Sequence, residues 1–296
     1  MDRAEWLETV RRRKVERFDT LHAPDYDEHW GAVPATHADY VARLVAATPP
    51  GGRVLDAACG TGRFFPQLIA AGLRVEGVDA SAAMLANAAR KHPDVPTRVA
   101  GLRTLAVDAP YDAVMCVDAL ENLPPEDWPA AIAALRAAAR DGAPVYLTVE
   151  RADADDIARL NGEAADAGLP VVDGEMADTD GGYHYYPPRT RVRDWLAEAG
   201  LDVVDEADGD DYWHLLCRAA PHSTPDPTTR RTPTATSRRR RRRPSIASLA
   251  VGTGAGMAGA VVLLLVAGAF GAAGVVVTAA VEALVVYVLY RWSPTP

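Results

Sequence analysis

Two glycines and two acids lie near the start of the chain at a spacing that suits a nucleoside ligand. Residues 54–62 read VLDAACGTG, an apolar run that meets an acid and then a turn with two glycines. Glycine lets a backbone approach a ligand closely and adopt positive φ. Asp79 ends the next apolar run, where a carboxylate can accept both hydroxyls of a ribose. A tight turn and a helix cap would explain each feature alone, but together they predict a nucleoside site.

The acid before the glycines restricts the kind of nucleoside. A dinucleotide-binding loop has a third glycine in the pattern G-x-G-x-x-G, and Phe65 stands at that position. Asp56, at the tip of the first apolar run, would repel a pyrophosphate and would suit a ligand that carries an ammonium group. A nicotinamide-dependent oxidoreductase is therefore the disfavoured alternative.

These residues resemble the class I S-adenosylmethionine-dependent methyltransferases, and most of all their small-molecule branch. The resemblance is carried by residues 54–62, by GVDAS at 77–81 with Met84 and Leu85 after it, and by YDAV at 111–114. It covers roughly residues 35–218. It implies S-adenosylmethionine as the cofactor. It also implies an α/β, Rossmann-like, mostly parallel sheet of seven strands, with helices on both faces and the last strand antiparallel.

The resemblance also assigns roles to individual residues. It implies that the loop from Asp56 to Gly62 holds the methionine part of the cofactor and that Asp79 holds the ribose. Asp118 matches a position that faces the methionine part and the substrate, although a solvated strand end is the alternative. Residues 101–103 would flank adenine, but the Asp-Ala pair that family members often have there is missing. The implied cofactor-binding residues are Asp56, Ala58, Gly60, Gly62, Asp79, Ala80, Leu102 and Asp118.

Alternating strands and helices must position these residues. Apolar runs predict strands over residues 53–56, 73–78, 97–100, 111–117, 143–149, 201–206 and 212–218. Helical patterns lie over residues 64–71, 82–91, 129–140 and 190–199, with Ser81 as a helix N-cap and Gly200 as a helix end. Such alternation predicts a parallel sheet covered on both faces. The short link 207–211 predicts that the last two strands pair antiparallel.

Two segments rich in aromatic and histidine residues are candidates for the acceptor pocket. The first contains Tyr26, His29 and Trp30, and the second contains Tyr183, His184 and Tyr185. We expect both segments to close over one cleft, where aromatic rings could face a cationic sulfonium. His184 is the candidate general base for an oxygen or nitrogen acceptor. The alternative is that these side chains only pack a cap. No metal-ligand spacing stands out, so no metal is expected.

The composition divides the chain into three parts. Residues 1–220 form the predicted methyltransferase domain, with residues 1–34 as a cap or lid. Residues 221–245 are rich in Pro, Ser, Thr and Arg, which predicts a disordered linker. Residues 246–290 carry one charge, Glu282, in an otherwise almost wholly apolar run, and residues 246–291 predict a membrane hairpin of two helices. That hairpin would contact membrane lipid and keep the enzyme domain in the cytoplasm. A single crossing is the alternative.

Composition and charge exclude several classes of protein. A chain that is 49% hydrophobic is not disordered throughout, and three scattered cysteines do not build a disulfide scaffold. The net charge of −9 is the sum of a body of −16 over residues 1–220 and a basic tail of +7, and the acidic body disfavours a nucleic-acid substrate. We therefore predict methyl transfer to a small molecule, a lipophilic one among the options. A non-catalytic scaffold of the same fold is the alternative. The acceptor, the methylated atom and the oligomeric state are left open.

Overall fold

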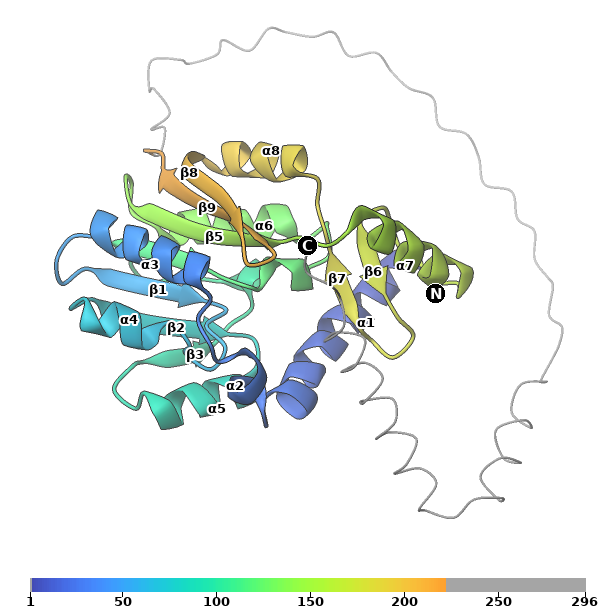
Figure 1. The fold of residues 1–296 in the computed structure, drawn as a ribbon, viewed down its shortest axis with the longest axis horizontal. Coiled ribbons are helices and arrows are strands. Elements are labelled where there is room, and N and C mark those ends of the chain that lie inside the picture. The colour runs from blue at the N-terminus through green and yellow to red at the C-terminus, as the bar shows by residue number, and fades with distance from the viewer. Residues whose placement is uncertain (1, 222–296) are drawn as a thin grey trace, which may run out of the picture. The chain divides into compact units, whose positions relative to one another are not determined.

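The computed structural model describes residues 2–221, and within them the chain forms one seven-stranded sheet and one separate two-stranded sheet (Figure 1). The order in the large sheet is β3-β2-β1-β4-β5-β9-β8. Its strands are β1 (Arg53–Ala57), β2 (Arg74–Asp79), β3 (Thr97–Val99), β4 (Ala113–Cys116), β5 (Pro144–Glu150), β8 (Leu201–Gly209) and β9 (Tyr212–Ala219). The small sheet pairs β6 (Glu175–Ala177) with β7 (Tyr183–Tyr185).

The helices alternate with the strands of the large sheet. They are α1 (Arg3–Arg17), α2 (Tyr26–Trp30), α3 (Ala35–Ala47), α4 (Phe65–Ala70), α5 (Ala82–Lys91), α6 (Trp128–Ala138), α7 (Ala154–Asp166) and α8 (Arg189–Ala199). A π-helical turn, η1 (Phe18–His22), continues α1, and two 3-10 turns, η2 (Leu102–Thr104) and η3 (Leu120–Asn122), follow β3 and β4.

The pairing directions agree with the sequence prediction. Strand β1 pairs in parallel with β2 and β4, and β9 pairs antiparallel with both β5 and β8. The carboxyl ends of β1, β2 and β4 therefore meet at one edge of the sheet, which is where ligands bind in open α/β folds. Strand β8 continues to Gly209, beyond the predicted end, and turns into β9 through Asp210 and Asp211, both at positive φ.

Two hydrophobic clusters cover the two faces of the sheet. Successive strand residues point to opposite faces, so Val54 packs with α3 and α4 while its neighbour Leu55 packs with α6 and α8. The first cluster includes Val41, Leu44, Phe65 and Leu68, and the second includes Ile132, Leu135, Trp195 and Leu196. This two-sided burial explains why the strands are nearly continuous apolar runs in the sequence.

Local signals in the sequence placed most helix ends correctly. The Ser81 hydroxyl accepts from the Met84 amide at 3.1 Å and caps α5, and Gly200 ends α8 at φ +74°. The predicted strand over 111–117 is shorter than expected and begins at Ala113. Tyr111 instead forms an isolated bridge with Ala139, which directly follows α6. The ring of Tyr111 is buried.

The N-terminal segment and the small sheet lie next to each other, although they are far apart in sequence. Figure 1 draws α1 beside β7, and three side chains of α1 reach residues beyond 120. Arg3 forms two hydrogen bonds to the buried carboxylate of Glu175 in β6, at 2.9 and 3.0 Å. The predicted cap of residues 1–34 therefore contains α1, η1 and α2, and α1 is fixed to the insertion that follows β5.

The predicted tail has no structural description. The linker over 221–245 and the membrane segment over 246–291 lie outside the described residues, apart from residue 221. Within residues 2–221, no helix combines the length and the apolar character that a membrane crossing needs.

Candidate active site

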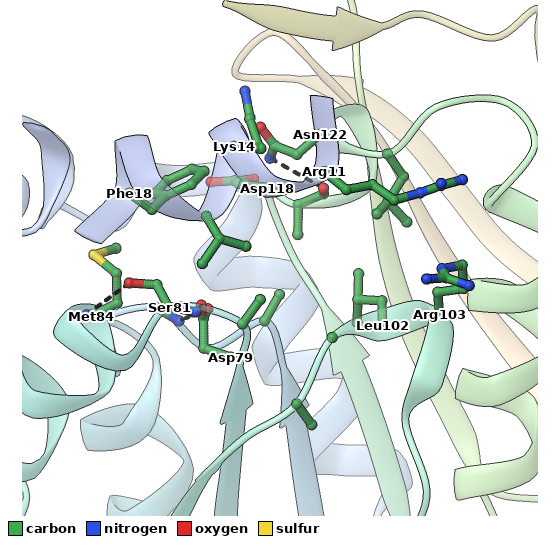
Figure 2. A pocket seen from close by; sticks show the side chains of 18 of the residues that line it. Arg11, Lys14, Phe18, Asp79, Ser81, Met84, Leu102, Arg103, Asp118 and Asn122 are labelled. Atoms are coloured by element: carbon green, nitrogen blue, oxygen red, sulfur yellow. Dashed lines mark hydrogen bonds between the residues drawn. The ribbon is translucent and has the colours of Figure 1, made fainter. Parts of the chain in front are cut away.

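A cavity of about 250 Å³ lies at the carboxyl ends of β1, β2 and β4 (Figure 2). Figure 2 shows Arg11 and Lys14 of α1, and Phe18 at the start of η1, across the cavity from Asp79 and Leu102. Most of the lining is apolar. Its lining includes Lys14, Phe18, Tyr26, Ala58, Gly60, Asp79, Ala80, Leu102, Asp118 and Asn122. The strand ends thus form the floor of the cavity, and the N-terminal segment forms its roof.

The glycine loop after β1 takes a backbone conformation that most residues avoid. Gly60 and Gly62 have φ of +54° and +78°, and Ala58 has φ of +63°. A Cβ atom at Gly62 would lie 2.6 Å from the Phe65 ring, so glycine is required there by packing as well as by φ. The loop thereby brings Gly60 to the cavity, where its amide donates to Asp79 Oδ2 at 2.8 Å.

Asp79 ends β2 and has a fixed orientation. Its Oδ1 accepts from the Ser81 amide and its Oδ2 from the Gly60 amide, both at 2.8 Å. Burial raises the pKa of Asp79, and hydrogen bonds from the Ser81, Gly60 and Ala80 backbone oppose the rise. Each carboxylate oxygen has a second lone pair. The side chain can therefore accept two hydroxyl groups while it stays tied to the loop.

Asp56 is buried at the end of β1 and lacks a partner for one oxygen. It is 1% exposed, and Oδ2 has no hydrogen bond among the described residues. Burial raises its pKa to about 7, Arg63 opposes this rise, and the neighbouring Asp79 and Asp118 add to it. An unpaired buried carboxylate is costly without a cation or donor. An ammonium group would supply both, but Asp56 itself is not among the residues that line the cavity.

Asp118 follows β4 in a strained conformation and lines the cavity. Its φ is +52°, and its amide donates to Thr148 Oγ1 at 2.8 Å. The carboxylate accepts from His37 Nε2 at 2.8 Å and also pairs with Arg63. Burial alone would raise the pKa of Asp118, but the His37 hydrogen bond and the Arg63 charge outweigh it and hold the pKa below its usual range. Asp118 is therefore an anion whose position is fixed.

Lys14 is a roof residue that the sequence analysis missed. Its Nζ donates to the Tyr183 carbonyl at 2.8 Å, and burial lowers its pKa to about 8 while the charges of Glu121 and Glu150 oppose that shift. In Figure 2 its amine extends away from Asp79 and Leu102. The spacing of Arg11, Lys14 and Phe18 on α1 is the i, i+3, i+7 pattern of one helix face, which could have indicated a shared surface.

One further buried acid was also missed. Glu121, in η3, is 4% exposed, and its Oε2 has no hydrogen-bond partner among the described residues. Burial, then Glu150, then Asp118 raise the pKa of Glu121 well above its usual range. Its Oε1 accepts from Asn122 Nδ2 at 2.9 Å. Glu121 is thus best described as a neutral acid close to the cavity.

The first of the two predicted pocket segments reaches the cavity with one residue. Tyr26 lines the cavity, and burial raises its pKa to about 12, so its hydroxyl stays protonated. His29 and Trp30 do not line it. His29 lies 3.1 Å from the Asp25 carbonyl, and the Trp30 side chain is 47% exposed. The one-turn helix α2 carries all three residues but turns only Tyr26 inward.

The second predicted segment does not line the cavity, contrary to our expectation. Tyr183 and Tyr185 point from β7 into the core, where the Tyr183 hydroxyl donates to Glu175 at 2.5 Å and the Tyr185 ring meets Trp128. His184 alternates with them and points the other way, with Nδ1 3.0 Å from both Glu150 Oε2 and Tyr186 Oη. Helix α1 supplies the roof in place of β7, because α1 packs on this small sheet.

Comparisons with known proteins support the architecture. A family model described as a methyltransferase domain matches residues 29–206. A ubiquinone biosynthesis O-methyltransferase from Xanthomonas campestris is 32% identical over 179 residues, which is 56% of this chain and 69% of the relative. An amino-sugar relative is the dTDP-4-amino-2,3,4,6-tetradeoxy-D-glucose N,N-dimethyltransferase of Saccharopolyspora spinosa. It is 29% identical over 106 residues, which is 33% of this chain and 43% of the relative.

Solved structures share the fold at low identity. The magnesium protoporphyrin IX methyltransferase from Synechocystis PCC 6803 with bound SAH has a TM-score of 0.53 at 20% identity, over 71% of this chain and 98% of that one. A 1,6-didemethyltoxoflavin-N1-methyltransferase from Burkholderia thailandensis has a TM-score of 0.54 at 16% identity, over 75% and 92%.

The sheet order and the cavity at its carboxyl edge define a Rossmann-like fold of the seven-stranded methyltransferase class. The chain belongs to the methyltransferase-domain family. Its activity is methyl transfer, and its cofactor is S-adenosylmethionine.

Proposed function

We propose that this enzyme methylates a hydroxyl oxygen of a small, largely apolar molecule bound beneath α1. The observation that carries this proposal is that one cavity joins two kinds of lining. Asp79 and Asp118 come from the strand ends, and Lys14 and Phe18 come from the N-terminal segment. The first pair suits the cofactor, and the second pair suits an acceptor that meets the cofactor at its methionine end.

The proposed roles of the cofactor residues follow the sequence prediction, and of the eight residues all but Asp56 and Gly62 line the cavity. Asp79 would accept the ribose hydroxyls, Leu102 would pack against adenine, and Asp56 would accept from the ammonium group. The small residues of this region would let the backbone come close to the cofactor. Three of them line the cavity, namely Ala58, Gly60 and Ala80, and Gly62 shapes the loop. When bound, the sulfonium supplies a methyl group to the acceptor oxygen and leaves as a neutral thioether.

Lys14 is our candidate for the general base. A pKa of about 8 gives its amine a neutral fraction near neutral pH, which is the requirement for accepting a hydroxyl proton. Lys14 lines the cavity, and in Figure 2 its amine points away from Asp79 and Leu102, where Nζ donates to the Tyr183 carbonyl. An oxygen acceptor must lose its proton as it attacks. The relative with the longer match, over 179 residues, is an O-methyltransferase, which supports oxygen over nitrogen.

The test uses two variants of α1, one that removes Lys14 and one control that keeps it, and two acceptors. Lys14→Met should lower kcat about 10²- to 10⁴-fold toward an alkyl-substituted catechol, with cofactor affinity changed by much less. Arg12→Met, on the exposed side of the same helix, should match the parent. Products are identified by mass spectrometry. Full turnover by Lys14→Met would overturn the base assignment. Methylation of a dTDP-amino sugar in place of the catechol would overturn the oxygen assignment.

We also propose that residues 246–291 anchor the enzyme in a membrane, a proposal that rests on sequence alone. A stretch of this length and apolar character is about twice what one crossing needs, which favours a hairpin. Arginines at 238–243 favour a cytoplasmic position for the enzyme domain. Reporter fusions at residue 244 and at the C-terminus should report the same side. Signals on opposite sides would contradict the hairpin, and recovery without detergent would contradict the anchor.

A further inference from the structure

Three metal-ligating side chains meet next to the cavity but outside it. His37 comes from α3, Asp210 from the turn between β8 and β9, and His214 from β9. One ligand atom of each lies within 4.8 Å of the others. His37 Nδ1 and Asp210 Oδ2 are 3.6 Å apart. Ligand atoms around one Zn²⁺ are separated by about 3–4 Å, given bonds of roughly 2.0–2.2 Å. A small rotation of the exposed Asp210 side chain would close the difference.

His37 provides the strongest reason to expect a ligand. Its ring is 0% exposed, and Nδ1 has no hydrogen-bond partner among the described residues. Nε2 donates to Asp118, so in a neutral ring the Nδ1 lone pair faces the Asp210 carboxylate. A lone pair and an anion that face each other in a buried site require a positive charge between them. A metal ion at this position would supply that charge.

The other two residues are held in ligand-like orientations. The Tyr146 hydroxyl donates to His214 Nδ1 at 2.8 Å, and His214 Nε2 donates to the Gly209 carbonyl at 2.9 Å. The Thr36 amide donates to Asp210 Oδ2 at 2.8 Å. Metal-binding histidines in proteins commonly make such a hydrogen bond with the nitrogen that does not bind the ion. His37 has that arrangement through Nε2 and Asp118, and His214 would have it if Nδ1 carried the proton and donated to the Tyr146 hydroxyl oxygen.

We propose that His37, Asp210 and His214 bind a divalent transition-metal ion, with Zn²⁺ as the representative ion. Two imidazoles and one carboxylate are a ligand set for Zn²⁺ and for other ions of its borderline class. The ion would bind Nδ1 of His37 and Nε2 of His214. The ring proton of His214 would move from Nε2 to Nδ1, which would then donate to the Tyr146 hydroxyl oxygen, and the hydrogen bond from Nε2 to the Gly209 carbonyl would be lost. Asp210 has 30% of its side chain exposed, which offers a route for the ion.

The position of the site suggests what the ion does. It would tie the N-terminal turn of α3 to the β8–β9 turn, which come from opposite ends of the domain. It would also fix the His37 ring, whose Nε2 holds Asp118 in the cavity. The ion would therefore support the methyltransferase site without touching it. The sequence spacing did not indicate this site, because two of the three ligands lie more than 170 residues from the first.

The test measures Zn²⁺ and Co²⁺ binding to the full-length chain. We expect one Zn²⁺ per chain by calorimetry and by elemental analysis after dialysis, and a visible absorption band when Co²⁺ replaces it. Asp210→Asn and His214→Gln keep hydrogen-bonding side chains but should weaken Zn²⁺ binding by more than about 100-fold. Asp211→Asn is the matched control, because Asp211 lies in the same turn and is exposed, and it should bind like the parent.

Three outcomes would overturn the proposal. One is that the parent chain binds no more Zn²⁺ than the Asp210→Asn variant does. Another is that Asp211→Asn loses as much affinity as Asp210→Asn. The last is Co²⁺ binding without the absorption band of histidine ligation. If His214→Gln fails to fold by circular dichroism, Asp210→Asn decides the question, because its amide oxygen can still accept from Thr36.

Discussion

The floor and the roof of the cavity are built in different ways. The floor comes from β1, β2 and their loops, and its central contact joins two residues 19 positions apart, Gly60 and Asp79. The roof comes from α1, which reaches its partners across more than 100 residues. The floor is held by backbone hydrogen bonds within a buried sheet. The roof is held by side-chain contacts, and mainly by ion pairs between side chains.

This difference predicts how substitutions in the floor and in the roof of the cavity affect the protein. The floor can lose a ligand contact without unfolding, because the strands around it are paired on both sides. The roof depends on Arg3 with Glu175 and on Arg11 with Asp127, and both acids are buried. A buried acid that loses its partner is strongly destabilising. Substitutions in the floor should therefore change cofactor affinity, and substitutions in the roof should change stability.

The largest expected effect is on cofactor binding by Asp79→Ala. Two ribose hydroxyls would lose a charged acceptor, at about 1.5–3 kcal/mol for each hydrogen bond, so affinity for S-adenosylmethionine should fall about 10²- to 10⁴-fold. Calorimetry measures the change. Asp94→Ala, an exposed acid beyond the end of α5, is the control and should bind normally. Equal affinities of the two variants would show that the floor does not bind the ribose through Asp79.

The next largest effect is on the stability of the roof. Arg3→Leu leaves Glu175 buried beside the Tyr183 hydroxyl without its cation, so the free energy of unfolding should fall by about 3–5 kcal/mol. Urea denaturation measures the loss, and early proteolysis within α1 would locate it. Arg12→Leu on the same helix should have almost no effect. If both variants lowered the free energy of unfolding by the same small amount, the Arg3–Glu175 ion pair would not hold the roof.

Asp56→Asn should separate stability from binding within the floor. The raised pKa means that the folded protein binds this proton more tightly than the unfolded chain, so stability falls as pH rises from about 4 to 7. The cofactor-free variant should therefore gain roughly 1–3 kcal/mol near pH 8 and lose that pH dependence. It should also bind S-adenosylmethionine more weakly. Unfolding curves from pH 4 to 8 that parallel the parent would contradict the assignment.

The smallest expected effect belongs to His184→Gln. His184 lies against Glu150 and Tyr186 and does not line the cavity, so its loss should reduce kcat by far less than the ~10²-fold that a general base contributes. Steady-state kinetics beside Lys14→Met make the comparison direct. A larger loss for His184→Gln than for Lys14→Met would return the base role to the residue that the sequence first suggested.

The sequence determined most of the floor and the order of the sheet. The run from Asp56 to Gly62, Asp79 and the cap at Ser81 are recognisable because their geometry depends on neighbouring residues. Local backbone rules govern turns, caps and strand ends. The alternation of apolar runs and helices determined the sheet for the same reason, since burial on both faces demands continuous apolar strands. Even there, the end of β8 and the start of β4 differed by a few residues.

Only the tertiary structure decided the roof, the orientation of β7 and the cluster around His37. Whether Tyr183 or His184 faces a cavity depends on which side of a two-stranded sheet α1 covers, and the alternation in β7 is compatible with either choice. Lys14 is an ordinary helix residue until burial beneath the small sheet lowers its pKa. His37 meets Asp118, Asp210 and His214 only when α3 packs on the far strands. Contacts of this kind depend on packing between distant segments, which local patterns of residues do not encode.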